Sequence, residues 1–383
     1  MPHDNTIFNQ LLHLVPRHEF QKLVRRYDSD RYVKHFTTWQ QFITLLYAQV
    51  RGKDSLRDIE TSLSVSQPKW YHLGLKSVKR STLSDANTNR NPKIYEDMFY
   101  TILNRCKAVT PKHKFRFKNP LYSIDGTTIS LCLSMFPWAK YKQQLGALKM
   151  HCLYDHSGSI PSFIVVTDAK QYETKVVRQH QLPVLPDSII AMDKGYKDYT
   201  WLNSLDKSSI YFVTRITQGT RYEITGQHEG GKGKGVLFDQ RIQLNSKKYE
   251  KDLRLVGYED PESGKQLEFL TNNFTLAAST IAKIYKARWE IELFFKWIKQ
   301  NLKIKSFLGT SENAVLSQIW VAMCYYLLLS YIKYQTKYSY SLLELSRMFS
   351  EVLLERMSLI DLLSCTQANI SMAREPDNQL RLL

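Results

Sequence analysis

The sequence predicts an α/β protein in which helical segments flank a strand-rich centre. Up to about residue 115, apolar residues recur at spacings of three and four, as they do on one face of a helix. From about residue 120, short runs rich in β-branched and aromatic residues replace that pattern and end at turn signals. The chain has 383 residues, of which 43% are hydrophobic. It is therefore long and apolar enough for a large core with appended domains.

Residues 1–115 form the predicted helical domain. Two helix starts carry a capping pattern, one at Ser55 and one at Thr82, and a basic connector lies between them. Two short helices joined in this way suit a helix-turn-helix-like reader of DNA. A plain helical cap over the core explains the same pattern, so the residues alone leave both interpretations open.

Residues 116–310 form the predicted α/β core. Its strand-like runs cover 121–131, 147–155, 159–168, 188–193 and 210–217, and helix-like stretches cover 173–182 and 198–205. Asp125 lies in the first of these strands, and Asp193 ends the fourth. At about 217–275, alternating runs broken by turn residues predict a β-rich insertion in the core.

Residues 311–383 form a predicted helical C-terminal region. Within it, the apolar run 314–332 has nearly the length needed to span a bilayer. Polar residues interrupt the run, among them Ser317, Gln318 and Ser330, and three tyrosines lie in it. We therefore expect a buried helix rather than a membrane span, and no membrane partner.

Composition narrows the classes of function. Lysine and arginine number 53 against 36 acidic residues, which gives a net charge of +17. Such an excess is typical of proteins that meet nucleic acid or an anionic membrane. The five cysteines lie far apart without a CxxC pair. This spacing argues against a disulfide framework or a zinc site and favours a reducing compartment, the cytoplasm.

The segment 281–302 carries the densest group of chemically active side chains. A phenol, a guanidinium, a carboxylate and an ammonium follow one another at spacings of 3, 4 and 7: Tyr285, Arg288, Glu292 and Lys299. On one predicted helix all four fall within an arc of roughly 60°, beside an apolar arc. A carboxylate that holds a divalent cation beside groups that bind phosphate suits phosphodiester chemistry. A surface helix with supporting ion pairs is the simpler alternative.

This helix, together with Asp125 and Asp193, resembles the DDE transposases of insertion sequences. More narrowly it resembles the IS four group, whose signature is Tyr, two residues, Arg, three residues, Glu, six residues, Lys. The chain carries that signature without a gap from Tyr285 to Lys299, and it carries the group's DxGY from Asp193 to Tyr196. The N-terminal segment also resembles the domain often fused to this group, which favours DNA binding by residues 1–115.

The resemblance implies an RNase H-like catalytic core, in which the ends of the first and fourth strands meet. It implies an enzyme that binds terminal inverted repeats of double-stranded DNA, cleaves the element's ends and joins the 3′-hydroxyls to target DNA. A homodimer and a hairpin intermediate are implied as well. Asp125, Asp193 and Glu292 are then the catalytic metal ligands. Their cofactor is a pair of Mg²⁺ ions, for which Mn²⁺ can substitute.

The same resemblance implies a set of DNA-binding residues: Tyr285, Arg288, Lys296, Lys299 and Arg215. The two lysines approach phosphates near the transposon end, and the tyrosine and the first arginine grip the terminal nucleotides. His151 also recurs in the family, but we expect an ordinary strand residue with a satisfied hydrogen bond. Trp289 is expected to pack beside the site.

Two other functions remain compatible with the sequence. One is a transposase-derived DNA-binding protein without catalysis, which the complete set of three carboxylates disfavours. The other is an RNase H-like host nuclease, which would not need a basic helical N-terminal domain. A metal titration separates the first from an active enzyme, because a pure binder needs no Mg²⁺. Inverted repeats immediately outside the coding region would identify a transposase.

Overall fold

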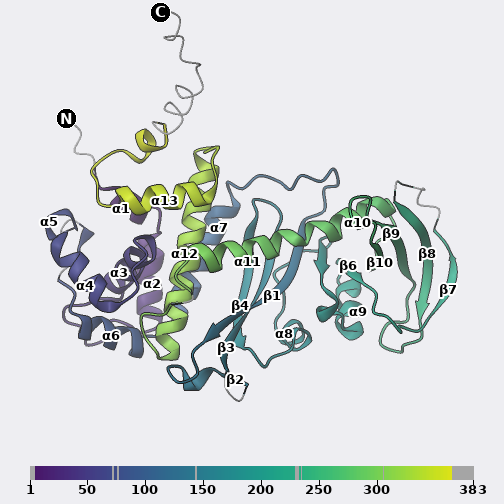
Figure 1. Ribbon diagram of the computed structural model, residues 1–383, viewed down its shortest axis with the longest axis horizontal. Coiled ribbons are helices and arrows are strands. Elements are labelled where there is room, and N and C mark those ends of the chain that lie inside the picture. The colour runs from purple at the N-terminus through teal and green to yellow at the C-terminus, as the bar shows by residue number, and fades with distance from the viewer. Residues whose placement is uncertain are drawn as a thin grey trace, which may run out of the picture. The chain divides into compact units, whose positions relative to one another are not determined.

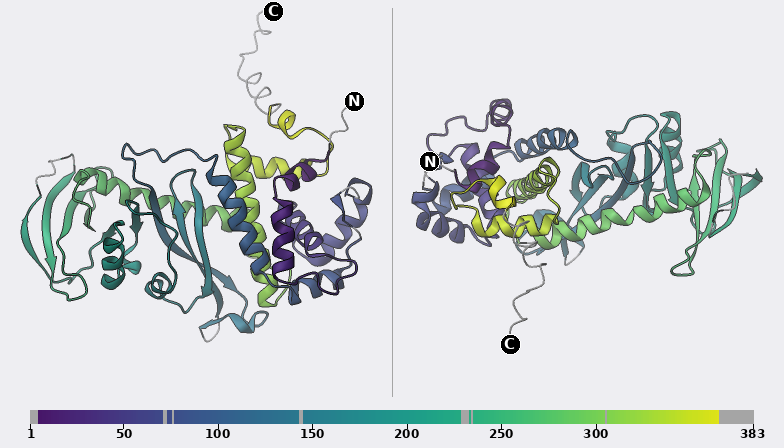
Figure 2. Two further views of the ribbon diagram at one scale, coloured as in Figure 1. Left: turned by 180° about the vertical axis from the view of Figure 1, so that it is seen from behind. Right: turned by 90° about the horizontal axis from the view of Figure 1, so that it is seen from above.

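The computed structural model describes residues 5–70, 73–75, 77–142, 145–228, 233, 235–304 and 306–364. The chain divides into two compact units, one of Met1–Thr110 with Asn301–Leu383 and one of Pro111–Gln300. Figures 1 and 2 show helices in the first unit and a twisted sheet with helices in the second. The helical C-terminal segment therefore shares a unit with the N-terminal helices.

The first unit is helical in its described parts. Its helices are α1 Ile7–His13, α2 Arg17–Arg26, α3 Thr38–Val50, α4 Leu56–Val65, α5 Gln67–Trp70, α6 Arg80–Asn89, α7 Lys93–Lys107, α12 Glu312–Gln335 and α13 Leu342–Val352. The apolar run forms α12, which packs against α3, α6, α7 and α13. Although α12 is long and apolar enough to cross a membrane, 89% of its most apolar window is buried inside the protein.

One of the two predicted helix starts is correct. The Ser55 hydroxyl accepts the backbone N–H of Asp58 at 3.1 Å and caps α4. Thr82 does not cap a helix, because α6 already begins at Arg80 after the extended residue Lys79, whose side chain makes no capping bond. The prediction at Thr82 is wrong since the chain leaves its extended conformation before it reaches that residue.

The second unit is built on one mixed sheet. Its strands are β1 Leu121–Leu131, β2 Lys140–Lys142, β3 Leu145–Asp155, β4 Ile160–Asp168, β5 Ile189–Met192, β6 Tyr211–Arg215, β7 Tyr222–Gln227, β8 Val236–Leu244, β9 Leu253–Glu259 and β10 Gln266–Thr271. They run in the order β2-β3-β1-β5-β6-β10-β9-β8-β7, and β4 pairs with β3. β5 lies parallel to both β1 and β6, and the other pairs are antiparallel.

The β-rich segment at about 217–275 extends the core sheet. β10 pairs with β6 through Phe269 and Arg215, and β9, β8 and β7 follow outward. Close packing continues into this part, because a Cβ added at Gly257 would overlap the ring of Phe238. The edge of the core is therefore continuous with the strands that the sequence marks as an insertion.

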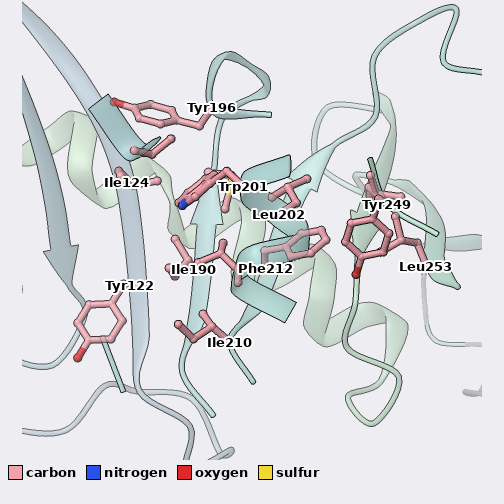
Figure 3. Packing of buried hydrophobic residues seen from close by; sticks show 14 of the residues in the cluster. Tyr122, Ile124, Ile190, Tyr196, Trp201, Leu202, Ile210, Phe212, Tyr249 and Leu253 are labelled. Carbon is pink, nitrogen blue, oxygen red and sulfur yellow. The ribbon is translucent and has the colours of Figure 1, made fainter. Parts of the chain in front are cut away.

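Helices cover both faces of the central strands. Because side chains alternate along a strand, Ile190 of β5 points to one face while its neighbours Ile189 and Ala191 point to the other. On the first face lie α8 Glu173–Gln179 and α9 Tyr199–Lys207, and Figure 3 shows Trp201 and Leu202 of α9 beside Ile190 and Phe212. On the second face lies α10 Ala278–Ala287.

A buried ion pair fixes the outer strands to the segment that leads into α10. The Arg254 side chain of β9 has no exposed surface. Its guanidinium donates to both carboxylate oxygens of Asp239 on β8, at 2.8 and 2.7 Å. It also donates to the carbonyl oxygens of Asn273 and Leu276, at 3.1 and 2.6 Å. This network ties β8, β9 and the turn before α10 together.

Replacing Arg254 by methionine should destabilise the protein by about 3–5 kcal/mol, because Asp239 would stay buried without its main partner. The free energy of unfolding, measured in urea, tests this. Arg241→Met on the same sheet is the control. That arginine pairs with Asp252 at 3.3 Å on the exposed surface, so its removal should cost at most about 1 kcal/mol. Equal destabilisation of the two variants would contradict the assigned role of Arg254.

Candidate nucleic-acid cleavage site

Two carboxylates meet at the centre of the sheet. Ile124 of β1 and Met192 of β5 are the last residues of the parallel pairing, so Asp125 and Asp193 follow at adjacent positions. The polar side chains emerge here because the buried apolar run of each strand ends at this point. Glu292 comes from α11, Trp289–Asn301, which packs on β3 through Phe294 and Tyr154, with ring centroids 5.6 Å apart.

The predicted single helix over 281–302 is wrong in one respect. It is interrupted at Arg288, where α10 ends and α11 begins. The N–H of Arg288 donates to the Tyr285 carbonyl at 3.2 Å, and that of Ile291 donates to the Arg288 carbonyl at 3.1 Å. These three-residue steps tighten the turn locally, as 3₁₀ geometry does. The interruption falls at the residue whose side chain makes the ion pairs described next.

The Arg288 guanidinium bridges two carboxylates. Its Nη1 donates to Asp125 Oδ2 at 3.0 Å and its Nη2 to Glu292 Oε1 at 2.7 Å. The arginine side chain is only 12% exposed, against 20% for Asp125 and 34% for Glu292. Its Nε is buried without a hydrogen-bond partner among the described residues. The Arg288 guanidinium thus partly neutralises both carboxylates, while its Nε–H remains without an acceptor among the described residues.

The carboxylates lie close enough to repel one another. Burial is the main cause that raises the pKa of Asp125 to about 6. The hydrogen bond from the Gly126 N–H and the charge of Arg288 act in the opposite direction and lower this pKa. The negative charges of Glu292 and Asp193 add to the upward shift of this pKa. A site in which like charges disfavour ionisation gains from any further cation that enters it.

Tyr285 lies beside Asp193. Its hydroxyl is 3.5 Å from Asp193 Oδ1, and its ring packs on Phe269 at 4.9 Å between centroids. The Arg288 guanidinium carbon is 5.6 Å from the centroid of the same ring. Burial raises the pKa of this phenol. Arg215 is exposed at the end of β6 and near enough for its charge to act on Tyr285.

The remaining predicted residues lie on α11. Lys296 is exposed and Lys299 is half-buried. Trp289 is 58% exposed, so the expectation that it packs beside the site is wrong. Trp289 is the first residue of α11 and is not among the residues that this helix buries, which are Ile291, Phe294, Phe295 and Ile298.

A pair of buried polar side chains, His151 and Tyr196, lies beside Gly126, the residue after Asp125. His151 of β3 is paired with Gly126, and its Nδ1 lies 3.0 Å from the Tyr196 hydroxyl. The hydrogen bond expected for this strand residue is therefore present at Nδ1, while its Nε2 is buried and has no partner in the described part of the chain. A Cβ at Gly126 would come within 3.2 Å of both groups. The DxGY motif marked Tyr196, but no local pattern pointed to its partner.

A second contact missed by the sequence joins α11 to the sheet. His156 lies 2.7 Å from the Ser123 hydroxyl through Nε2 and 3.3 Å from Glu290 through Nδ1. The hydrogen bond from His156 is the main cause that lowers the pKa of Glu290. This contact holds the first turn of α11 beside β1.

The donor set suits a hard cation, although the side chains do not enclose one as they stand. Carboxylate oxygens are the ligands that Mg²⁺ and Mn²⁺ prefer. Among the residues that the structure describes, no three His, Cys, Asp or Glu side chains are grouped closely enough to hold a metal ion. The Arg288 guanidinium lies between two of the three candidates and supplies the positive charge there.

Comparison with known proteins finds a family and several relatives. The family described as Transposase DDE domain matches residues 116–328, more than half of the chain, and a domain of unknown function, DUF4372, matches residues 3–76. A putative transposase of Sinorhizobium fredii is 32% identical over 254 residues, which cover 64% of this chain and 69% of the relative.

Two further relatives and one solved structure are similar. A probable transposase for insertion sequence element IS5377 of Geobacillus stearothermophilus is 28% identical over 69% of this chain and 70% of its own. A putative insertion-sequence transposase of Synechocystis is 25% identical over 76% and 83%. A piggyBac transposase synaptic complex with hairpin DNA has a TM-score of 0.49 and 13% identity, over 94% of this chain and 84% of that one.

The buried His151 should make the protein less stable in mild acid. Burial lowers its pKa from 6.5 to about 4, so the unfolded chain binds the proton more readily between these pH values. The free energy of unfolding should therefore fall as pH drops through this window, by at most about 3 kcal/mol from this residue. His151→Gln should remove that fall, whereas the opposite contribution of Asp125 remains in both proteins.

Urea unfolding at a series of pH values measures the difference. The exposed His18 of α2 offers a control, since His18→Gln should follow the curve of the unmodified protein. If His151→Gln is destabilised in acid as much as the unmodified protein, the buried neutral imidazole is not responsible.

Proposed function

Because the chain belongs to the transposase DDE family, it is an enzyme that cleaves DNA and transfers strands, and we propose how its own residues do so. The substrate we propose is the pair of terminal inverted repeats of an insertion sequence. The enzyme cleaves the element's ends and joins the 3′-hydroxyls to target DNA. The observation that carries this proposal is the convergence of Asp125, Glu292 and Arg288 on one partly buried point, with Asp193 adjacent.

The core that presents these residues is proposed to be RNase H-like. Three antiparallel strands, β1, β3 and β4, are followed by α8 and then by β5, which lies parallel to β1. This order puts the first aspartate in the central strand and the second at the end of its parallel neighbour. The third carboxylate then arrives on a helix that follows the last strand of the sheet.

We assign Asp125, Asp193 and Glu292 as the ligands of the divalent metal ions that the family uses, with Mg²⁺ the physiological ion and Mn²⁺ a substitute. Bound ions would activate the oxygen nucleophile and neutralise charge on the leaving 3′-oxygen. The electrostatics of Asp125 support this assignment. Burial is the main cause that raises the pKa of this carboxyl, the charges of Glu292 and Asp193 add to the rise, and a bound cation would offset both effects.

Arg288 has two roles in this proposal. In the structure it is the internal counter-ion of Asp125 and Glu292. When DNA and metal are bound, its planar fork, including the unpartnered Nε, becomes available to a phosphate oxygen. The cation–π contact with Tyr285 keeps the guanidinium near the site during the exchange.

The other cationic residues are proposed to position the transposon end. Lys296 and Lys299 are one and two turns beyond Glu292 on α11, and Arg215 lies on the Tyr285 side. Phosphate contacts from such residues fix the register of the DNA without reading its sequence. A homodimer that synapses two ends and a hairpin intermediate remain part of the proposal.

Sequence recognition is proposed to reside in the N-terminal helices, within residues 1–115. The family model of unknown function covers part of this region. Because α12 packs on α3, α6 and α7, a fragment that ends at residue 115 would lack a core helix. Recognition is therefore best tested in the full chain. We place the protein in the bacterial cytoplasm.

Removing the charge of any one carboxylate should abolish cleavage. Asp125→Asn, Asp193→Asn and Glu292→Gln each keep the side-chain volume but weaken the metal ligand. Cleavage of DNA that carries the element's ends, assayed with Mg²⁺, should fall to background while binding of the same DNA persists.

A matched control is Asp198→Asn. Asp198 caps α9 through the Trp201 N–H at 2.9 Å, and asparagine caps as well. It should cleave like the unmodified enzyme. Near-normal cleavage by any of the three site variants would remove that residue from the metal site.

Arg288→Gln should separate metal binding from catalysis. The variant lacks two charged hydrogen bonds that compete with the ion, each worth about 1.5–3 kcal/mol, so Mn²⁺ should bind the DNA-free protein at least about tenfold more tightly. Cleavage should nevertheless fall, because glutamine cannot replace the guanidinium at the phosphate. Titration calorimetry with Mn²⁺ measures the affinity.

Lys299→Ala provides the comparison on the same helix. It should weaken cleavage and the stable complex with a cleaved end without changing the Mg²⁺ concentration required. Unchanged Mn²⁺ affinity in Arg288→Gln, or full cleavage by Lys299→Ala, would contradict the respective assignment.

A further inference from the structure

A basic segment precedes the first core strand and alternates in its exposure. Its odd-numbered residues His113, Phe115, Phe117 and Asn119 are half-buried, and the four even-numbered residues from 112 to 118 are exposed. Each exposed residue carries a positive charge: Lys112, Lys114, Arg116 and Lys118. We call residues 112–118 the basic strap. None of its four cations forms an ion pair within the described part of the structure.

The basic strap is anchored rather than loose. Phe115 and Phe117 pack against the apolar cluster between the sheet and α10. The rings of His113 and Phe117 lie 5.0 Å apart, and those of Phe115 and Phe117 lie 5.1 Å apart. The ring of His113 accepts the Phe115 N–H at 3.3 Å and donates to the Asn119 carbonyl at 2.8 Å. These interactions hold the backbone from which the charged side chains project.

The basic strap borders the helix pair of the cleavage site. The central residues of the basic strap line a hollow of about 650 Å³. The hollow is completed by Leu276, in the turn before α10, and by Thr280 and Lys283 of α10. Lys283 is exposed and adds a fifth cation. This lysine stands two residues before Tyr285 on α10, and the Tyr285 hydroxyl lies 3.5 Å from Asp193 Oδ1. The cations of the basic strap therefore lie beside α10, the helix that leads to Tyr285 and Arg288.

We propose that the basic strap and Lys283 form a seat for the phosphate backbone of duplex DNA beside the cleavage site. Cations that form no ion pair among the described residues, on an anchored segment beside the cleavage site, suit the backbone of the same duplex, which carries a dense row of negative charge. Phosphate contacts of this type position DNA irrespective of its sequence. The inference rests on the family's action on DNA and is independent of which carboxylates hold metal.

The salt dependence of DNA binding tests the proposal in the full chain. The variant changes Lys112, Lys114, Arg116 and Lys118 together to glutamine and leaves the aromatic anchors in place. In a plot of log affinity against log salt for a linear duplex, the slope should become shallower by about 0.9 for each phosphate that is no longer neutralised, and by up to about 3.6 for all four. Affinity should fall at least tenfold at moderate salt.

Lys286→Gln is the matched control. Lys286 is an exposed lysine of the same α10, but it pairs with Glu262 at 2.7 Å. Its slope should equal that of the unmodified protein. A wild-type slope in a quadruple variant that melts like the unmodified protein would overturn the proposal. If the quadruple variant does not fold, the single variants Lys114→Gln and Arg116→Gln decide the question, each with an expected change of about 0.9.

Failure of this proposal and failure of the proposed function are distinguishable. The slope is measured on uncleaved DNA without a metal ion, so it does not depend on Asp125, Asp193 or Glu292. An unchanged slope with cleavage that depends on the three carboxylates removes only the basic strap. A shallower slope in a chain that never cleaves retains the strap as a DNA-binding surface.

Discussion

The Arg288 guanidinium is the interaction on which the rest of the site depends. Asp125 lies 163 positions before Arg288 along the chain and Glu292 lies four after it, and this one side chain holds both. Without it, the partly buried carboxylates of Asp125 and Glu292 would lose the cation that pairs with both, a condition that costs several kcal/mol or forces protonation. The helix interruption, the packing of Tyr285 and the register of β1 on β5 all bring groups to this guanidinium.

The same dependence reaches into the scaffold. α10 delivers Arg288, and the turn before α10 is held by the buried Arg254. α11 delivers Glu292, and its first turn is held through Glu290 and His156. Both arginines are satisfied by carboxylates within the fold, but only Arg288 keeps an unpartnered donor among the described residues. Arg254 is therefore suited to stabilise the fold, and Arg288 is suited to exchange its partners when DNA binds.

Much of the fold follows from local pattern. The run 121–131 is the strand β1 with the predicted bounds, because alternation along one strand reports which face is buried. Pairing between distant segments leaves no such local trace. The junction of β10 with β6 and the packing of α12 among the N-terminal helices could not be predicted for that reason.

The site shows the same division. The spacing from Tyr285 to Lys299 matches a family signature and so predicted the segment that we propose to carry Glu292 of the site, since fixed offsets on a helix place side chains on one face. The interruption at Arg288 was not predictable, because it accompanies ion pairs whose other partner, Asp125, is remote in sequence. The contact of His151 with Tyr196 is likewise made between distant segments. In the basic strap, by contrast, the alternation of cationic with aromatic or histidine residues is present in the sequence itself. The structure adds that Phe115 and Phe117 are packed against the core.

Anomalous diffraction from crystals of the complex with DNA and Mn²⁺ tests the central claim most directly. The account predicts Mn²⁺ within about 2.2 Å of carboxylate oxygens of Asp125 and Glu292, with Asp193 completing the ligand set. It also predicts that the Arg288 guanidinium has left both carboxylates for a phosphate oxygen. Mn²⁺ bound elsewhere, with Arg288 still bridging Asp125 and Glu292 in the presence of DNA, would contradict it.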